Sequence, residues 1–340
     1  MRVCPYLLCI LIFFSCLADQ KISQGKFFRL LKIQPNEQEA RKFGGLRTLA
    51  KIYSAHFQGL EKLELVECGI SDLQPLSYLT DLKWLRLSHN PVSDLAPLAG
   101  LNKLQVLGLY GVSTSGDART GISDLSPLMN LRNLWSLTLD ENNISDLSPL
   151  EDLKELKTLY LTQNRISDIS TLANLVQLRK LYLSRNQVTN IAPLGNLAEL
   201  NWLQLSENQI SDLSALRSCT KLEGLFVNRG RISDISVLRR HIELQELSLK
   251  SNQISSIDSL LNLVNMRELY LDNNNISSLA PLRNMKSLRV LSLANNQVSD
   301  LSSIMGLRNL RTLILMGNPY EESQIDSLKL AMPRCEVVLQ

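Results

Sequence analysis

A period of 22 residues runs through most of this 340-residue chain and strongly limits the folds that it can adopt. The shared pattern is LxxLxxLxLxxNxISDLxPLxx, as in LKELKTLYLTQNRISDISTL from Leu153, and nine copies carry Asn in the same slot. Full copies begin at Phe57, Leu79, Leu101, Leu131, Leu153, Leu175, Leu197, Cys219, His241, Leu263 and Met285, and a partial copy begins at Leu307. Such a period predicts a stack of similar units, each in contact mainly with its neighbours.

The LxL part of each copy predicts a short strand. In Leu159-Tyr160-Leu161 the apolar residues alternate with an exposed one, which is the period of a β-strand. We therefore expect Leu159 and Leu161 to point into the core and Tyr160 to point outward. Leucine makes up 71 residues of the chain, which suits a core slot that every copy repeats.

The second half of each copy predicts a turn and a short return segment. Asn164 stands where the chain leaves the strand, and its amide is suited to bond backbone groups that have no partner in a sheet. Ser145 and Asp146 open the return, and such side chains commonly cap a short helical turn. Pro149 fits the first turn of that helix.

By period and residue type the chain is identified as a member of the leucine-rich repeat proteins. Its copies resemble the 22-residue class found in bacterial internalins and in the eukaryotic leucine-rich regulatory subunit of protein phosphatase 1. The resemblance covers roughly residues 57–340 and implies a protein-binding scaffold without catalysis. It predicts an α/β solenoid, a right-handed curved array with a concave parallel β-sheet and short helical or 3-10 turns on the convex side. NQISDL or NNISDL together with an export signal looks bacterial.

The sequence predicts four segments. Residues 1–18 have the basic start, apolar run and small residues of a secretory signal peptide, and the run is shorter than the ~20 residues that span a bilayer. A lipoprotein signal over 1–15, with Cys16 as the lipidated residue, is the alternative. The rest divides into a partly helical N-terminal cap (19–56), the repeats (57–318, with an insertion near 112–120) and a C-terminal helix–strand cap (319–340).

The remaining residue types give no sign of catalysis. Cys68, Cys219 and Cys335 lie far apart after the signal, so they form neither a disulfide framework nor a zinc site. The sequence has no GxSxG, P-loop or HExxH motif. We predict no enzyme activity, no cofactor and no metal; capping explains the Ser–Asp pairs without calcium. The net charge of +3, without a basic run, predicts no nucleic-acid partner.

Exposed strand positions are expected to form columns on the concave face. Adjacent strands lie ~4.8 Å apart, so the aromatic residues from Tyr160 to Phe226 would fall within ~14 Å. Large aromatic residues on a surface are typical binding hot spots, although stacked aromatics also stabilise a sheet. A polar rim of Arg179, Lys180, Arg185 and Glu207 is expected beside them. The candidate partner-binding residues are Trp84, Tyr110, Tyr160, Lys180, Tyr182, Trp202, Phe226 and Tyr270.

These features predict an exported, monomeric binding protein that holds a protein or peptide on its concave face, either secreted or attached to the cell envelope. Any contact with a membrane would be through a lipid at Cys16. Two alternatives remain at this level: an intracellular regulatory scaffold resembling the phosphatase 1 subunit, and a passive envelope component without a specific partner.

Overall fold

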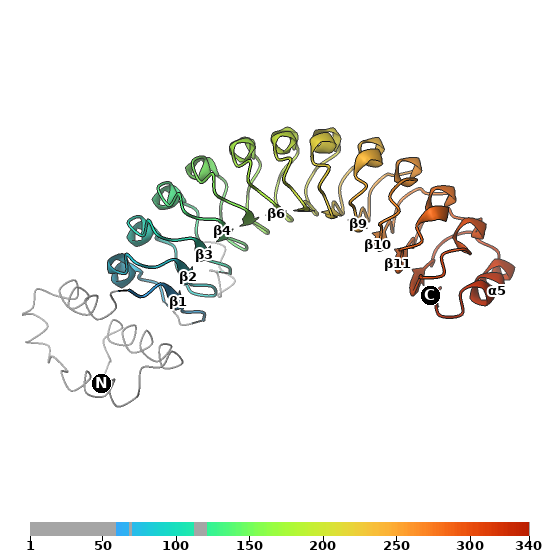
Figure 1. Ribbon diagram of the computed structural model, residues 1–340, viewed down its shortest axis with the longest axis horizontal. Helices are drawn as coiled ribbons and strands as arrows, with labels where there is room; N and C mark the ends of the chain where they lie inside the picture. Colours follow the sequence, from blue (N-terminus) through green and yellow to red (C-terminus); the bar gives the residue numbers. More distant parts are fainter. Residues whose placement is uncertain (1–58, 68–69, 112–120, 340) are drawn as a thin grey trace, which may run out of the picture. The chain divides into compact units, whose positions relative to one another are not determined.

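The computed structural model describes residues 59–67, 70–111 and 121–339 (Figure 1). The predicted signal segment with Cys16, the predicted N-terminal cap (19–56), Cys68 and the insertion near 112–120 lie outside these residues. The contacts divide the chain into two units, Met1–Leu156 and Lys157–Gln340, which are named unit 1 and unit 2 below and are described separately.

In unit 1, each repeat contributes one three-residue strand and one 3-10 helix. The strands pair in parallel, with residues of equivalent repeat position side by side. They are β1 (Lys62–Glu64), β2 (Trp84–Arg86), β3 (Val106–Gly108) and β4 (Ser136–Thr138). The 3-10 helices are η2 (Gln74–Tyr78), η3 (Ala96–Leu98), η4 (Ser126–Leu128) and η5 (Ser148–Leu150).

Unit 2 repeats the same arrangement and ends in an α-helix and a last strand. Its strands are β5 (Thr158–Tyr160), β6 (Lys180–Tyr182), β7 (Trp202–Gln204), β8 (Gly224–Phe226), β9 (Glu246–Ser248), β10 (Glu268–Tyr270), β11 (Val290–Ser292), β12 (Thr312–Ile314) and β13 (Glu336–Val338). Its helices are η6 (Ser170–Asn174), η7 (Ala192–Asn196), η8 (Ser214–Ser218), η9 (Ser236–Arg240), η10 (Asp258–Leu260), η11 (Ala280–Asn284), η12 (Ser302–Ile304) and α5 (Glu322–Ala331).

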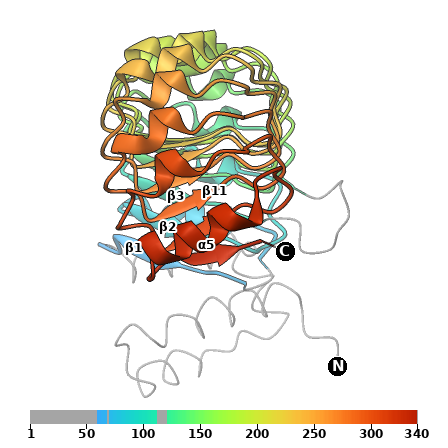
Figure 2. The same cartoon turned by 90° about the vertical axis from the view of Figure 1, so that its right-hand side faces the viewer.

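The predicted solenoid is confirmed within each unit. All neighbouring strands of unit 2 pair in parallel and in sequence order. Its 3-10 helices form a single row on the side away from the strands (Figures 1 and 2). The predicted strand phase is also correct, because Leu159 and Leu161 have 0% exposure whereas Tyr160 remains partly exposed.

The asparagine side chains bond backbone groups as predicted, and together they form a ladder of hydrogen bonds along the repeats. The Nδ2 atom of Asn186 donates to the carbonyls of Leu161 and Leu183 at 2.8 and 3.0 Å. Its Oδ1 atom accepts from the backbone N–H of Ile166 at 3.0 Å. The two carbonyls directly follow three-residue strands and the N–H group lies in the return segment; all three are buried, so each repeat depends on its neighbour to satisfy them. In unit 2, one repeat departs from the pattern, because Gly230 occupies the asparagine slot.

The cap of the 3-10 helices differs from the prediction in detail. The carboxylate of Asp146 accepts from the backbone N–H and from the hydroxyl of Ser148, both at 2.8 Å. The N-cap residue itself is Leu147, which makes no side-chain cap bond, and Pro149 lies in the first turn as expected. The aspartate thus forms an Asx turn one residue before the N-cap. Two bonds to one carboxylate account for the repeated aspartate without a bound cation.

A left-handed residue between each strand and its asparagine was not predicted. Among the described residues, ten other than glycine have φ between 54 and 59°. They are Glu67, His89, Glu141, Gln163, Arg185, Glu207, Arg229, Ser251, Asn273 and Asn295. This conformation turns the chain out of the strand and directs the side chains to the rim of the strand face.

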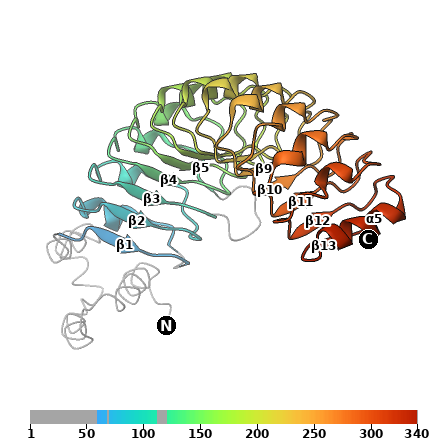
Figure 3. The same ribbon diagram turned by 45° about the vertical axis from the view of Figure 1, so that its right-hand side comes forward.

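The C-terminal end of unit 2 is covered by α5, which lies beside β12 and β13 (Figure 3). Ile325 and Leu328 of α5 are buried at 3% and 0% exposure. The Gln324 side chain accepts from the backbone N–H of Leu301 at 2.9 Å and donates to the carbonyl of Ser299 at 2.8 Å. These contacts close the core after the last repeat. In the described part of the chain, no helix is long and apolar enough to cross a bilayer.

Candidate functional site

Four outward-pointing aromatic residues of unit 2 form two contacting pairs. Tyr160 and Tyr182 lie opposite each other on β5 and β6, and their rings stack with centroids 4.4 Å apart and planes at 13°. Trp202 of β7 and Phe226 of β8 make a tilted contact at 5.3 Å and 37°. We name these four residues the aromatic cluster. All four remain partly exposed, so the cluster is part of the strand face rather than of the leucine core.

Trp202 reaches Phe226 because Gly224 has no side chain. The two residues at this register position, Trp202 and Gly224, lie side by side on β7 and β8. A Cβ atom at Gly224 would lie 2.6–2.9 Å from three ring atoms of the indole. The indole therefore lies over the backbone of β8, which leaves one face of the ring toward the strand face of the sheet. Its N–H group is buried and has no hydrogen-bond partner among the described residues.

Tyr270 is separate from the aromatic cluster. It lies on β10, and buried Ser248 of β9 is between it and Phe226 in the same column. Its hydroxyl donates to Glu268 at 2.8 Å, and the ammonium of Lys250 lies 4.6 Å from its ring centroid. Burial and the Glu268 carboxylate raise the pKa of Tyr270 to about 12.

Two further predicted residues, Trp84 and Tyr110, lie in unit 1. The Trp84 ring is near the cationic ends of Lys62 and Arg86, at 5.1 and 5.8 Å. The Tyr110 hydroxyl donates to Glu141 at 3.0 Å, and this hydrogen bond is the main reason why the pKa of Tyr110 is raised. Both aromatic rings thus already have polar neighbours within unit 1.

The residues of the predicted polar rim are divided between the two ends of the strands. The left-handed residues Arg185, Glu207 and Arg229 form a row, with ion pairs of 3.4 Å between Arg185 and Glu207 and 3.7 Å between Arg229 and Glu207. Lys180 and Arg179 are exposed at the other end of β6. The surface around the stacked tyrosines is therefore mainly basic.

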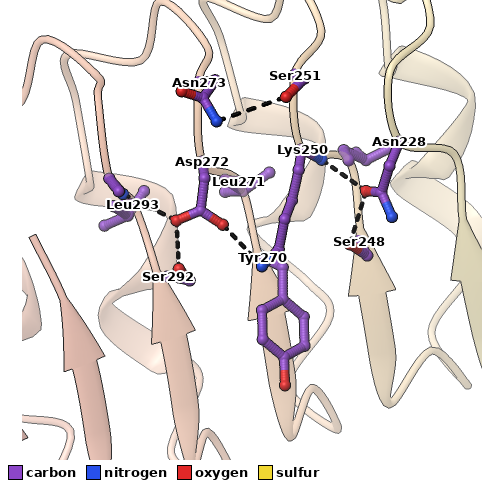
Figure 4. Close-up of polar contacts among 12 residues, drawn as sticks. Asn228, Ser248, Lys250, Ser251, Tyr270, Leu271, Asp272, Asn273, Ser292 and Leu293 are labelled. Carbon is purple, nitrogen blue, oxygen red and sulfur yellow. Dashed lines mark hydrogen bonds and ion pairs between the residues drawn. The ribbon is translucent and has the colours of Figure 1, made fainter.

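A polar network that the repeat pattern did not predict lies at the carboxyl ends of β8 to β11 (Figure 4). The Asp272 side chain is buried and accepts from the hydroxyl of Ser292 and from the backbone N–H of Ala294, and it pairs with Lys250 at 3.1 Å. Asn228 accepts from Ser248 at 2.7 Å and from the backbone N–H of Lys250 at 2.8 Å. The sequence does contain a signal for this network. Counted from the first residue of each copy, Asn228 and Asp272 are in the tenth position, and Ser248 and Ser292 are in the eighth position of the following copy.

Two buried polar residues replace leucine on the side away from the strands. His241 has 0% exposure and its Nε2 atom lies 3.0 Å from the carbonyl of Leu216; burial lowers its pKa. Cys219 donates to the carbonyl of Leu194 at 3.4 Å, and burial raises the pKa of its thiol to about 11. An inaccessible thiol that stays protonated is a poor nucleophile. Within the described ranges, no group of three His, Cys, Asp or Glu side chains is placed to hold a metal ion.

The repeats and their geometry define the class of protein. A family model described as leucine rich repeat matches residues 132–188, and one described as two copies of leucine rich repeats matches 242–284 and 286–330. The chain is therefore a leucine-rich repeat protein, and its repeats resemble those of the internalins.

Solved structures support this assignment. An internalin, InlF, from Listeria monocytogenes shares 29% sequence identity and a TM-score of 0.72, over 88% of this chain and 96% of the internalin. A leucine-rich repeat protein from Leptospira interrogans has 22% identity and a TM-score of 0.65, over 82% and 83% of the two chains. The ectodomain of the plant receptor kinase GASSHO1/SCHENGEN3 from Arabidopsis thaliana has 21% identity and a TM-score of 0.50; the match covers 79% of this chain and 43% of the receptor chain. A comparison with curated proteins found none that matches this sequence.

Proposed function

We propose that this protein is an exported, non-catalytic scaffold that holds a protein or peptide partner on the strand face of its repeats. The observation that carries the proposal is the aromatic cluster, in which Tyr160 stacks on Tyr182 and Trp202 contacts Phe226 on four adjacent strands. Contiguous aromatic surface on a soluble protein is characteristic of interaction sites, and Tyr and Trp are enriched among hot-spot residues.

The surroundings of the cluster support the same proposal. The ion pairs of Arg185, Glu207 and Arg229 form a polar border along one side of it. An aromatic centre with a polar border is the usual organisation of a protein interface. Among the matched structures, the plant receptor was solved in complex with CASPARIAN STRIP INTEGRITY FACTOR 2. We expect the partner here to lie across β5 to β8.

Export is the second part of the proposal. It is supported by the predicted signal peptide over 1–18 and by the resemblance to internalin repeats. Cleavage would leave a secreted monomer that begins at Asp19, whereas lipidation at Cys16 would attach the protein to the envelope. The intact mass of the protein from its native cells separates the two forms, and a mass that includes residues 1–18 would contradict export.

The binding proposal is tested with the double variant Tyr182→Ala/Phe226→Ala. Immobilised wild-type protein and variant are exposed to envelope and extracellular material from native cells, and captured proteins are compared. We expect the variant to lose the capture with a thermal unfolding midpoint close to that of the wild type, because both side chains point out of the core. The matched control is Val176→Ala/Val264→Ala, which removes exposed apolar groups (49% and 47% exposure) outside the strands. Equal capture by both variants would contradict the proposal.

A further inference from the structure

Two glutamates lie in the same register row as Trp202 of the aromatic cluster. In one register row of unit 2, Trp202, Gly224, Glu246 and Glu268 follow one another on β7, β8, β9 and β10. Both glutamates are half-buried. Neither glutamate forms an ion pair with another described residue. Glu268 accepts a hydrogen bond from the hydroxyl of Tyr270.

In the free protein, the negative charges of Glu246 and Glu268 carry an electrostatic cost in stability. Burial and the neighbouring Glu268 raise the pKa of Glu246, and the positive charge of Arg267 opposes this only in part. Like charges in a partly desolvated site destabilise each other, and a cation placed between them removes that cost. The ammonium of Lys250, which follows β9, is paired with Asp272 at 3.1 Å.

The row also offers an aromatic surface for a cation. The indole of Trp202 lies over Gly224 and therefore extends toward β9, where Glu246 is next in the row. Adjacent strands are ~4.8 Å apart, so Trp202 and Glu246 are separated by ~10 Å at the backbone. The indole itself fills the space above Gly224, so a planar group would stack on the outer face of the ring and reach Glu246 from there. Lys250 over the ring of Tyr270 is an example of a cation on an aromatic face in the same protein.

We propose that the surface formed by Trp202, Gly224, Glu246 and Glu268, named the acidic–aromatic row, receives an arginine side chain of the protein partner. A guanidinium group is planar, stacks on aromatic faces and pairs with carboxylates through two parallel hydrogen bonds. Exposed Arg179 and Lys180 lie on the opposite side of Trp202 and repel a cation there, which fixes the position of the arginine toward β9 and β10. This inference rests on the proposed function, because it names the partner chemistry for the same strand face.

The test is a selection of peptides from a random dodecapeptide display library on the full mature chain. We expect the selected peptides to be enriched in arginine, and to bind Glu246→Gln/Glu268→Gln at least tenfold more weakly than the wild type. Replacing the arginine of a selected peptide by citrulline, which is neutral and of nearly the same shape, should weaken binding to the wild type by a similar factor. The matched control is Glu243→Gln/Glu322→Gln, which removes two exposed carboxylates outside the acidic–aromatic row and should change affinity less than twofold.

The outcomes separate this inference from the function on which it rests. Peptides that lose binding to Tyr182→Ala/Phe226→Ala but tolerate citrulline and Glu246→Gln/Glu268→Gln would overturn the arginine site and leave the proposed function intact. A selection in which no peptide depends on Tyr182 and Phe226 would overturn the proposed function itself. Arginine-dependent peptides that lose affinity equally in the control double variant would show a general charge effect and would also overturn the specific site.

Discussion

The asparagine ladder leads to a quantitative comparison of Asn186→Ala with Asn208→Ala. The two side chains are similarly buried, at 9% and 6% exposure, and lie in adjacent repeats of unit 2. Asn208 donates to the carbonyls of Leu183 and Leu205 at 2.9 and 3.0 Å, and accepts from the backbone N–H of Val188 at 2.9 Å. The cavity and the lost side chain are the same in both variants, so their difference depends on the backbone groups that are left without partners.

The loss of Asn186 leaves one buried group unsatisfied. The Leu161 carbonyl still accepts from Asn164 and the Leu183 carbonyl still accepts from Asn208, so only the N–H of Ile166 loses its side-chain partner. One unsatisfied buried group costs about 1–3 kcal/mol.

The loss of Asn208 leaves two buried groups unsatisfied. The N–H of Val188 loses its acceptor, and the Leu205 carbonyl loses the hydrogen bond from Asn208. The carbonyls of Leu161 and Leu183 each accept a second bond from the asparagine of the next repeat, but Gly230 occupies that slot after Asn208. We therefore expect Asn208→Ala to lower the free energy of unfolding by about 1–3 kcal/mol more than Asn186→Ala.

Urea denaturation followed by far-ultraviolet circular dichroism measures this difference. Both residues are in unit 2, so the same transition reports on both variants, and equal m-values would show that the same structure unfolds. Equal costs, or a larger cost for Asn186→Ala, would refute the argument that shared carbonyls protect the ladder.

Three other substitutions test separate parts of the structure. Leu181→Ala empties a slot with 0% exposure and should lower the free energy of unfolding by about 2–5 kcal/mol; a near-neutral urea melt would contradict the strand phase. Gly224→Ala places a methyl group 2.6–2.9 Å from the indole of Trp202, so the ring must move. We expect a changed tryptophan emission spectrum and weaker partner capture, with a free energy of unfolding within about 1 kcal/mol of the wild type. An unchanged spectrum would show that the indole does not lie over β8. His241→Leu tests the buried histidine, because burial holds the pKa of His241 below 6.5 in the folded protein. As the pH falls through 6.5, the unfolded chain takes up a proton at this histidine and the folded chain does not. The free energy of unfolding of the wild type therefore decreases. The advantage of the leucine variant should then grow below pH 6.5, by at most about 1.4 kcal/mol per pH unit, whereas a constant difference from pH 7.5 to 5 would contradict it.

Repeat position predicted the fold well and the candidate site only in part. The alternation in Leu159-Tyr160-Leu161 correctly predicted which side chains enter the core, because every copy imposes the same strand phase. The same alternation placed Tyr182 and Phe226 on the strand face. It did not predict Glu246 or Glu268 as part of a site, because an isolated glutamate in an outward slot resembles any solvated residue.

The sequence by itself determined the repeating unit, the parallel stacking and the outward column that carries Tyr160 and Tyr182. A fixed 22-residue period puts equivalent positions side by side on neighbouring strands, so these features depend on spacing alone. The tertiary structure decided which outward residues touch. Trp202 contacts Phe226 because Gly224 leaves the space that the indole occupies, whereas buried Ser248 separates Phe226 from Tyr270. Such contacts depend on the volume and direction of side chains on adjacent strands, which a pattern read along one chain does not specify.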